Sequence, residues 1–355
     1  MQITRRKTKS VRVGNIKIGG DAPISVQSMT KTITSNVPAT VKQIKSLQKS
    51  GCEIVRLAVK DMASAKAIKE IKRKTDIPLV ADIHFNYQFA VEAMKNGIDK
   101  IRLNPGNIYK REQVVEIVSL AKKKRIPIRV GVNSGSVPRS RNLSLIDSMV
   151  KCCQDYIKLL EGMDFYDIVV SLKASSILEN VVAYRKMAKL CDYPFHLGLT
   201  ATGMFDAGII KSSLGIGMLL AEGIGDTIRV SLTSNPEKEV YVGSEILQSL
   251  GLRHFKPELI SCPTCGRCEV DLLKIVESIE KKMENMRFCS NGRKLPRIAV
   301  MGCFVNGPGE ATSADLGVAF GRNLGLVFKN GKVIKKLPKA QAVNLLIKEI
   351  ARYDR

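Results

Sequence analysis

The chain has no tryptophan, few aromatic residues and no long apolar run. Aromatic residues make up 5% of its 355 positions, which disfavours an exposed basic surface that stacks nucleic-acid bases. No stretch of about 18 uninterrupted apolar residues occurs, so the sequence predicts no membrane span. The N-terminus is basic, but no apolar segment follows it. We therefore expect no secretory signal and a cytoplasmic protein.

Acidic residues are also scarce. The chain has 57 Lys and Arg against 33 Asp and Glu, a formal net charge of +24. Such a charge favours anionic partners, whether nucleic acid, a phosphorylated substrate or an acidic protein. Much of it is spread over expected helix faces, where it could simply be solvated, so charge alone does not choose between these partners.

Short apolar segments rich in Val, Ile and Leu recur eight times in the first 235 residues. They span residues 24–29, 53–59, 78–84, 100–104, 127–133, 167–173, 194–200 and 227–233. Each is short and apolar on both faces, as buried parallel strands are. Amphipathic helical segments lie between them, at residues 42–49, 63–74, 113–124 and 144–160. Eight βα units in about 250 residues predict an α/β fold of the (β/α)8 TIM-barrel type, with a doubly wound sheet as the alternative.

The pattern changes on either side of this repeat. Residues 11–18 read as a hairpin that could plug the barrel bottom. Beyond residue 255 we expect helices at 271–283 and 339–352, strands at 298–302 and 316–320, and a hairpin at 324–335 around Asn330-Gly331. The sequence therefore predicts a barrel domain over residues 1–255 and a small α+β domain over residues 256–355.

Basic residues lie within the expected barrel strands, near the ends where such a barrel has its active site. They are Arg56, Arg102, Arg129, Lys173 and Arg229. Unpaired burial of these cations is costly. The strands hold few acids that could pair with them, although complete internal pairing remains the alternative. Arginine contacts phosphate through two parallel hydrogen bonds. Five cations exceed what one phosphate can use, so the set predicts a diphosphate site.

Cysteines are concentrated near the C-terminal end. Cys262, Cys265 and Cys268 form a Cys-x2-Cys-x2-Cys motif, and Cys303 follows some forty residues later. Without a secretory signal, metal binding is favoured over disulfides. These thiols suit zinc or an iron–sulfur cluster. A zinc ribbon normally has two Cys-x2-Cys pairs, and a second pair is absent. The motif therefore favours a cluster on Cys262, Cys265 and Cys303 with a non-cysteine fourth ligand.

Two other classes of protein remain open on these residues alone. One is a zinc-ribbon nucleic-acid-binding protein, which would bind nucleic acid in a salt-dependent way. The other is a barrel enzyme acting on a pterin or a sugar phosphate, with a structural metal in the appended domain. The buried cations argue against the first, and the identity of the metal would separate both from an iron–sulfur enzyme.

Together these segments resemble the 4-hydroxy-3-methylbut-2-en-1-yl diphosphate synthases, reductases of the methylerythritol phosphate route to isoprenoids. The likeness runs along nearly the whole chain. It is carried by Ser-Val-Gln27-Ser-Met-Thr30, Ala-Asp82-Ile-His84-Phe, Arg102-Leu-Asn104-Pro-Gly-Asn107, Val-Asn133-Ser-Gly-Ser, Ser-Leu-Lys173-Ala-Ser, Asp226-Thr-Ile-Arg229-Val-Ser231-Leu-Thr, Ser-Cys262-Pro-Thr-Cys265-Gly-Arg and Met-Gly-Cys303-Phe-Val-Asn-Gly-Pro-Gly-Glu310.

The resemblance implies an oxidoreductase, a homodimer whose barrel is followed by a [4Fe–4S] domain. The implied reaction opens the ring of 2-C-methyl-D-erythritol 2,4-cyclodiphosphate to give 4-hydroxy-3-methylbut-2-enyl diphosphate, with two electrons from reduced ferredoxin or flavodoxin. The implied cluster ligands are Cys262, Cys265, Cys303 and Glu310, of which Glu310 can exchange for substrate oxygen. The implied substrate-binding residues are Arg56, Arg102, Arg129, Asn133, Lys173, Thr200, Arg229 and Ser231. It implies neither a nucleic-acid partner nor a membrane.

Two positions depart from the family pattern. Cys268 stands where the family implies no ligand, and we interpret it as a bystander. The segment Thr200-Ala201-Thr202-Gly203 stands where the family usually has Thr-Glu-Ala-Gly, whose glutamate is thought to assist proton transfer. With Ala201 in that place, Asp82 or His84 is our candidate catalytic proton donor.

Overall fold

The computed structural model describes residues 3–138, 142–284, 286, 295–305 and 307–353. Their contacts divide the chain into two units, Met1–Arg253 and His254–Arg355. In the part of the chain that is described, no helix is long and apolar enough to cross a membrane.

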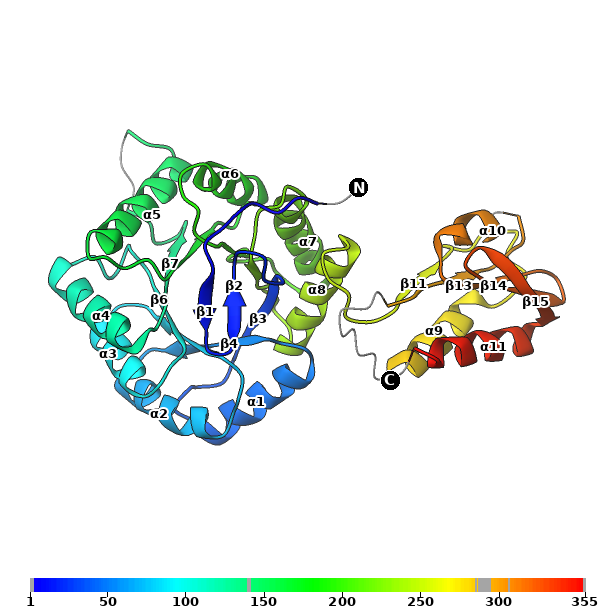
Figure 1. Ribbon diagram of the computed structural model, residues 1–355, viewed down its shortest axis with the longest axis horizontal. Helices are drawn as coiled ribbons and strands as arrows, with labels where there is room; N and C mark the ends of the chain where they lie inside the picture. Colours follow the sequence, from blue (N-terminus) through cyan, green and yellow to red (C-terminus); the bar gives the residue numbers. More distant parts are fainter. Residues whose placement is uncertain (1–2, 139–141, 285, 287–294, 306, 354–355) are drawn as a thin grey trace. The chain divides into compact units, whose positions relative to one another are not determined.

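The first unit is a closed barrel of parallel strands (Figure 1). Its strands are β3 (Ser25–Met29), β4 (Ile54–Val59), β5 (Leu79–Ile83), β6 (Lys100–Leu103), β7 (Ile128–Asn133), β8 (Ile168–Lys173), β9 (His196–Leu197) and β10 (Thr227–Ile228). They pair in the order β8-β7-β6-β5-β4-β3-β10-β9. A parallel bridge between Val170 and Phe195 joins the two ends of this order. The TIM-barrel prediction is confirmed, and the doubly wound alternative is wrong.

Eight helices of the described chain surround the barrel (Figure 1). They are α1 (Val37–Lys49), α2 (Met62–Arg73), α3 (Tyr87–Lys95), α4 (Arg111–Lys124), α5 (Leu145–Glu161), α6 (Ile177–Ala188), α7 (Phe205–Ala221) and α8 (Pro236–Ser249). Side chains cap several of their N-termini: Asn36, Asp61 and Ser144 each accept a hydrogen bond from a backbone N–H in the first turn. These caps fix where α1, α2 and α5 begin.

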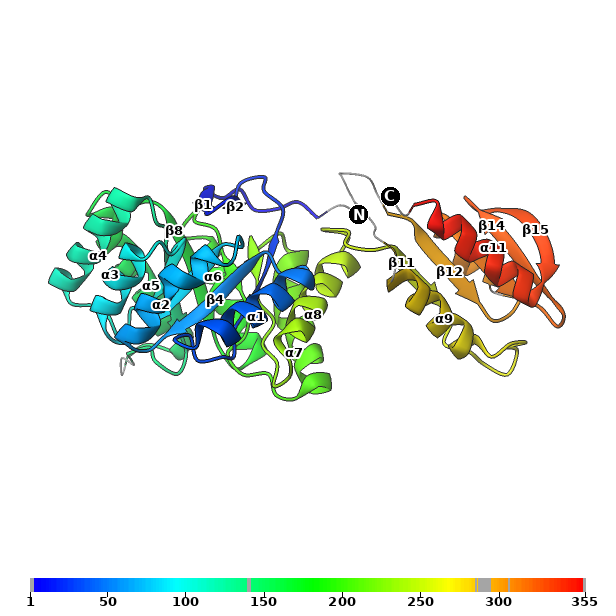
Figure 2. The same cartoon turned by 90° about the horizontal axis from the view of Figure 1, so that it is seen from below.

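An antiparallel hairpin precedes the barrel. It is formed by β1 (Val11–Val13) and β2 (Ile16–Ile18). Its residues Val13 and Ile18 are buried against Ile54 and Val80 of the barrel strands. Figure 2 shows the hairpin lying across one end of the barrel. Because Ile54 is the first residue of β4, this end holds the strand N-termini, and the predicted bottom plug is confirmed.

The last two barrel strands are shorter than the sequence pattern predicted. The expected strands spanned residues 194–200 and 227–233, whereas β9 and β10 have two residues each. Beyond β9 and β10, only scattered backbone bonds join these segments to their neighbours, such as Arg229 N to Leu197 O at 3.0 Å and Thr233 N to Gly203 O at 3.1 Å, and side chains supply other partners. Leu232 N donates to the Glu239 carboxylate at 3.1 Å. Most residues after β9 and β10 are still buried, so the apolar pattern of the sequence continues. The regular backbone pairing of the strands ends earlier, after Leu197 and Ile228.

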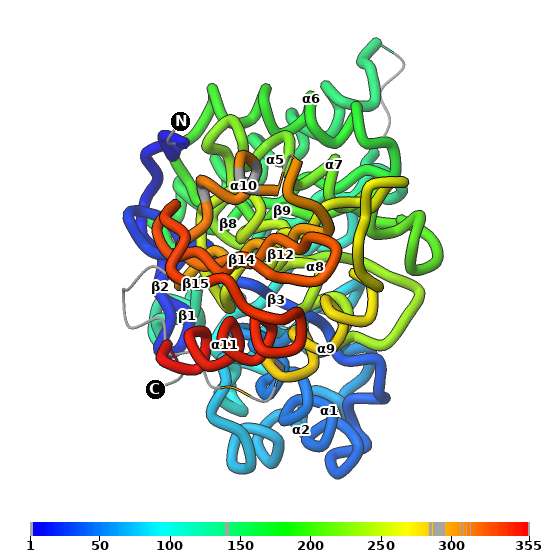
Figure 3. The backbone as a smooth tube through the Cα atoms, turned by 90° about the vertical axis from the view of Figure 1, so that its right-hand side faces the viewer, coloured from blue at the N-terminus to red at the C-terminus, as the bar shows by residue number. Residues whose placement is uncertain are grey.

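The second unit is a five-stranded sheet with helices on both faces. Its strands are β11 (Glu258–Ser261), β12 (Arg297–Met301), β13 (Leu316–Phe320), β14 (Leu324–Lys329) and β15 (Lys332–Pro338), paired in chain order. The first three run parallel, and the last two are antiparallel to their neighbours. Figure 3 shows α9 (Leu272–Glu284) and α11 (Lys339–Ala351) on one side and α10 (Gly307–Glu310) on the other.

The β14–β15 turn follows the predicted hairpin. Asn330 and Gly331 both have positive φ, +50° and +74°, as a type I′ turn requires. The strand β11 was not predicted, because residues 258–261 are only partly buried and form an edge of the sheet. The short helix α10 is followed by a 3₁₀ turn, Ala311–Ser313.

Candidate functional site

Three charged residues lie side by side across neighbouring barrel strands. Asp82 of β5 is in register with Arg102 of β6, and Arg102 is in register with Arg129 of β7. Residues in register on parallel strands point to the same face, so all three point into the barrel. Arg102 Nη1 lies 3.2 Å from Asp82 Oδ1, and Arg56 Nε of β4 lies 3.7 Å from Asp82 Oδ2. One carboxylate thus faces several guanidinium groups.

The excess of positive charge is deeply buried. Arg129 is 1% exposed, and its Nε and Nη1 have no hydrogen-bond partner among the described residues. Lys173, at the end of β8, is also buried, with Nζ 3.4 Å from His196 Nε2. Burial, followed by repulsion from Arg56, lowers the pKa of both Arg129 and Lys173 well below its ordinary value. An anionic ligand would relieve this imbalance.

Asp82 is held in its ionised form. Burial alone would raise the pKa of its carboxyl. Attraction to Arg56, the hydrogen bond from His84 and attraction to two further arginines outweigh burial, so the pKa of Asp82 lies well below its ordinary value. Asp82 therefore carries no proton near neutral pH and serves as an anchor for the surrounding cations.

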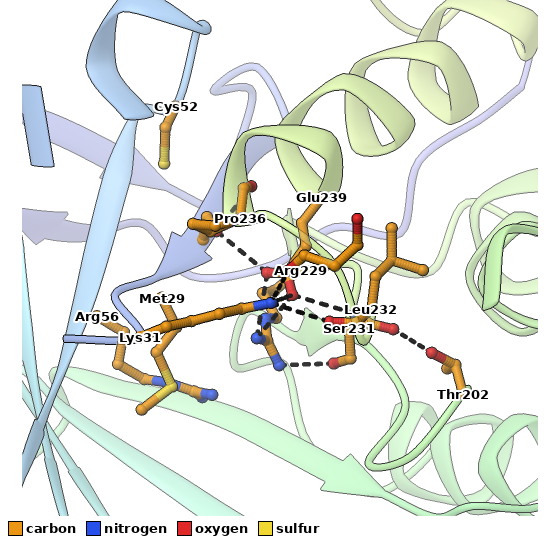
Figure 4. A network of polar contacts seen from close by, with 12 residues as sticks. Met29, Lys31, Cys52, Arg56, Thr202, Arg229, Ser231, Leu232, Pro236 and Glu239 are labelled. Carbon is orange, nitrogen blue, oxygen red and sulfur yellow. Dashed lines mark hydrogen bonds and ion pairs between the residues drawn. The ribbon is translucent and has the colours of Figure 1, made fainter. Parts of the chain in front are cut away.

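Arg229 has internal partners that Arg129 lacks, as Figure 4 shows. Its Nη1 donates to Ser231 Oγ at 2.6 Å, and its Nη2 lies 3.1 Å from Glu239 Oε2. Ser231 Oγ in turn donates to the carbonyl of Leu199 at 3.0 Å. The internal pairing considered from the sequence therefore holds for Arg229. The carboxylate that pairs with Arg229 belongs to Glu239, which lies on helix α8 and not on a barrel strand.

The remaining predicted residues lie around this group. His84 is half-exposed just after β5, with Nε2 3.5 Å from Asp82 Oδ2. Asn133 ends β7, and in one orientation of its amide the Asn133 oxygen accepts from Arg102 Nη2 at 3.3 Å. Thr200 is exposed, and only its backbone N–H is bonded, to Ala174 O at 3.3 Å, among the contacts described. Ala201 beside it is also exposed.

Two residues of this site were missed by sequence reasoning. Lys100 begins β6 and is fully buried, and its Nζ has no hydrogen-bond partner among the residues described. Burial and repulsion from the nearby arginines lower its pKa well below its ordinary value. It stands two residues before Arg102, so strand alternation places both on one face, a signal present in the sequence. Glu239 is the second residue that was missed. It lies on helix α8, and the strand pattern used to predict the site carries no information about helix residues.

In the second unit, three cysteines line one cavity. Cys262 follows β11 directly, Cys303 comes two residues after β12, and these strands are parallel neighbours. The cavity, of about 470 Å³, is lined by Cys262, Cys265 and Cys303 among others. The Gly302 N–H donates to Cys262 Sγ at 3.3 Å. The parallel strand ends therefore bring thiols together that are some forty residues apart in the chain.

Cys268 has a different environment. It is not among the residues that line the cavity. Its Sγ donates to Val270 O at 3.2 Å and packs against the core of the second unit. A Cβ at position 302 would lie 2.5 Å from this sulfur, so Gly302 leaves it room. The fourth cysteine of the motif region thus fills core space beside the cavity.

The thiols fit an iron–sulfur group in chemical type, and three of them line the same cavity. Thiolates are the usual ligands of such clusters. Thr264, between Cys262 and Cys265, has φ +64°, a costly conformation for a β-branched residue and one found at ligand-binding loops. Within the described residues, no three ligand groups are already gathered around one point. Glu310 ends α10, and its side chain lies outside the described part of the chain.

Comparison with known families accounts for both units. Residues 8–244 match the GcpE TIM-barrel domain, and residues 258–352 match the GcpE protein C-terminal domain. The chain belongs to the GcpE family. Nearly all of both units is covered by GcpE models, so the buried cations and the cysteine cavity both lie within GcpE domains.

Curated GcpE relatives match over nearly their full length. A protein of Thermodesulfovibrio yellowstonii is 49% identical over 99% of this chain and 100% of its own length. A protein of Ruminiclostridium cellulolyticum is 52% identical, covering 98% of both chains. Both are named 4-hydroxy-3-methylbut-2-en-1-yl diphosphate synthase (flavodoxin). These relatives give no support to the zinc-ribbon alternative.

Solved structures similar to this GcpE chain share the barrel only. A dihydropteroate synthase of Stenotrophomonas maltophilia has a TM-score of 0.53 and 11% identity, and covers 69% of this chain and 97% of its own. A type I 3-dehydroquinate dehydratase of Clostridium difficile has a TM-score of 0.51 and 16% identity, and covers 69% and 98%. At these identities the likeness concerns the fold.

Proposed function

We propose that this GcpE-family chain is a 4-hydroxy-3-methylbut-2-en-1-yl diphosphate synthase of isoprenoid biosynthesis. Its substrate would be 2-C-methyl-D-erythritol 2,4-cyclodiphosphate, which is opened and dehydroxylated with two electrons. The observation that carries the proposal is the buried group of cations in the barrel, since its excess charge calls for a polyanion. The names of relatives about 50% identical support it.

The barrel residues would bind and orient the diphosphate. Arg129 and Lys173 offer buried donors that lack a carboxylate partner among the described residues. Arg56 and Arg102 are anchored on Asp82, so their guanidinium groups are held in place before the substrate arrives. Preorganised donors lose little freedom on binding. The substrate-binding set proposed in full is Arg56, Arg102, Arg129, Asn133, Lys173, Thr200, Arg229 and Ser231.

His84 is the group we propose for proton delivery. Loss of the C3 hydroxyl as water consumes a proton, and histidine is the side chain that most often acts as a general acid. His84 is half-exposed and orients against Asp82 at 3.5 Å. Asp82, our other candidate donor, is held ionised by the surrounding cations, so in this proposal it orients His84.

The cysteine cavity would hold a [4Fe–4S] cluster through Cys262, Cys265 and Cys303, with Glu310 as the proposed fourth ligand. When bound, such a cluster supplies electrons one at a time at low potential. Cys268 takes no part in this proposal, because it does not line the cavity and its Sγ donates to Val270 O instead. The strained Thr264 holds two of the thiols on one short loop.

Partners follow from charge and from the relatives' names. Ferredoxin and flavodoxin are acidic proteins, and the net charge of +24 favours their approach. The names of the relatives specify flavodoxin, which we propose as one donor, with ferredoxin as the other. We also propose a homodimer in which the cluster domain of one protomer closes the barrel of its partner, as the family resemblance implies.

Replacement of Arg129 by Met tests the substrate site. Loss of a charge-assisted contact worth about 2 kcal/mol should raise KM for the cyclic diphosphate by about 30-fold. Stability should not fall, because the change removes a buried charge that lacks a carboxylate. Anaerobic turnover with reduced flavodoxin measures the first effect, and thermal unfolding measures the second.

Arg73→Met is the matched control for this test. Arg73 lies on the exposed face of α2, so this variant should behave as the parent. An Arg129→Met enzyme with unchanged kinetics would contradict the proposed site. A parent protein that does not turn over the cyclic diphosphate would contradict the function itself.

Measurement of the metal content tests the proposed cysteine ligands. Anaerobically purified protein should be brown and contain iron and sulfide. Cys262→Ser, Cys265→Ser and Cys303→Ser should each lose most of the iron, because serine is a poor ligand for the cluster. Cys268→Ser, the matched control, should keep it. A colourless protein with one zinc, or equal iron loss in all four variants, would contradict the assignment.

A further inference from the structure

Glu239 is a buried carboxylate with partners from three parts of the barrel. It lies in the first turn of α8 and is 1% exposed. It accepts a hydrogen bond from Ser28 Oγ at 3.1 Å and another from Leu232 N at 3.1 Å. Arg229 Nη2 lies 3.1 Å from its Oε2, and Lys31 Nζ lies 3.7 Å from its Oε1. Figure 4 shows the side chains of Lys31 and Arg229 reaching toward Glu239.

These partners lie on both sides of the seam between β3 and β10, one of the short strand pairings of the barrel. β3 and β10 pair through only two residue pairs, Thr227 with Ser25 and Ile228 with Val26. Beyond this short ladder, Glu239 joins residues on the β3 side to residues on the β10 side. Lys31 Nζ reinforces the link by donating to the carbonyl of Leu232 at 3.1 Å. Side chains therefore continue the closure of the barrel where the backbone ladder stops.

The contacts of Glu239 reach the proposed diphosphate site through Arg229. Arg229 uses Nη2 for Glu239 and Nη1 for Ser231 Oγ. Both carboxylate oxygens accept hydrogen bonds, from Arg229 and Leu232 on one side and from Ser28 on the other. An amide has one acceptor oxygen and would turn an NH₂ group toward a donor. Ser28 Oγ could accept from that NH₂ group, but an amide would leave Arg229 and Lys31 without the negative charge that the carboxylate supplies.

We propose that Glu239 is a positioning residue for the diphosphate site. It fixes the guanidinium of Arg229, and with it Ser231, at the end of β10, and with Lys31 it holds the loops after β3 and β10 together. The proposal rests on the proposed function, since Arg229 and Ser231 are taken there to bind the substrate. A purely structural role at the seam is the competing explanation.

Glu239→Gln in the intact holoenzyme tests this role. If Glu239 orients Arg229, KM for the cyclic diphosphate should rise about 10-fold, the effect of one misplaced charge-assisted contact. The value of kcat should change less than KM, because the lost interaction is one of uniform binding. Glu239→Asp keeps the charge on a shorter arm, so its KM should lie between those of parent and Glu239→Gln. Glu237→Gln, in the same helical turn, is the matched control.

A double-mutant cycle separates positioning from structure. In an Arg229→Met background, Glu239→Gln should raise KM no further, because the group it positions is gone. The same 10-fold effect in both backgrounds, or an unchanged KM in Glu239→Gln, would overturn the proposal. If Glu239→Gln does not fold, the cycle is run with Glu239→Asp. A parent enzyme without turnover would instead refute the proposed function, so the two failures are distinguishable.

Discussion

His196 shows, at the residue scale, that the barrel interior disfavours a further positive charge. It is fully buried on β9. Burial lowers its pKa well below the ordinary value, and repulsion from Arg129 and Lys173 lowers it further. Arg56 of β4 and Lys100 of β6 act in the same direction. The imidazole is therefore neutral in the folded protein at pH values where an unfolded histidine is already protonated.

This shift makes the barrel sensitive to acid. The unfolded chain binds a proton at position 196 below about pH 6.5, whereas the folded protein does not, so stability falls as the pH falls through that value. The loss should amount to about 1 kcal/mol between pH 6.5 and 5.5. Urea unfolding at both pH values measures it.

Histidine variants identify the residue responsible. His196→Gln should reduce the dependence of unfolding free energy on pH between 6.5 and 5.5. His254→Gln, which removes a histidine of the second unit, should leave the barrel transition as it is. If the pH dependence is the same in the parent and in His196→Gln, the assignment to His196 is wrong.

Residue-level prediction succeeded where strand alternation carries information. Arg102 and Asp82 were found because strand ends of a barrel collect functional groups, and the structure brings their side chains within 3.2 Å. Lys100 was missed although it is two residues from Arg102. Glu239 was missed because it lies on a helix, and the sequence of a helix does not show which of its side chains reaches the end of a strand.

At the element scale, strand β7 depends on a glycine beside the cation group. A Cβ at Gly131 would clash with Arg102 Nε and would lie 3.2 Å from Arg102 Cγ. Arg102 cannot move freely, since it is held by Asp82 and by the Gly131 carbonyl, at 2.7 Å from Arg102 Nη2. Close approach of this kind is a reason for glycine within a strand.

Gly131→Ala should therefore displace Arg102. We expect KM for the cyclic diphosphate to rise by about 10-fold, as for one lost charge-assisted contact, together with a lower melting temperature. Gly217→Ala on α7 is the control, because a Cβ there meets nothing within 4 Å. Steady-state kinetics and thermal unfolding measure both effects. Parent-like kinetics in Gly131→Ala would contradict the prediction that the added methyl group displaces Arg102 from its binding position.

Helix α7 explains why some elements were not foreseen. Phe205–Ala221 is apolar on most sides and contains Gly208, Gly215 and Gly217, so it lacks the polar face that marks an amphipathic helix. Two of these glycines have a packing reason: a Cβ at Gly208 would lie 2.5 Å from Leu232 Cδ2, and a Cβ at Gly215 would lie 2.8 Å from Leu199 Cδ1. Helix propensity is overridden here by close packing on the barrel.

For the whole molecule, the separation into two units predicts independent folding of the barrel. The unit Met1–Arg253 has its own buried core and its own plugged barrel, as a domain that folds alone requires. A fragment of residues 1–253 should unfold cooperatively and bind the cyclic diphosphate, measured by calorimetry, without containing iron. The same fragment with Arg129→Met is the control and should bind more weakly. A fragment without cooperative unfolding would refute this division.

The sequence by itself determined the barrel, the position of the cations and the spacing of the cysteines. These are local properties: the two-residue period of strands, the recurrence of βα units and the distance between thiols along the chain. Only the tertiary structure decided which groups meet. The register of β5, β6 and β7 aligns Asp82 with Arg102 and Arg129, and α8 brings Glu239 to Arg229. In the second unit, the cavity is lined by Cys262, Cys265 and Cys303 and not by Cys268. Contacts between distant segments depend on register and packing, which local patterns do not encode.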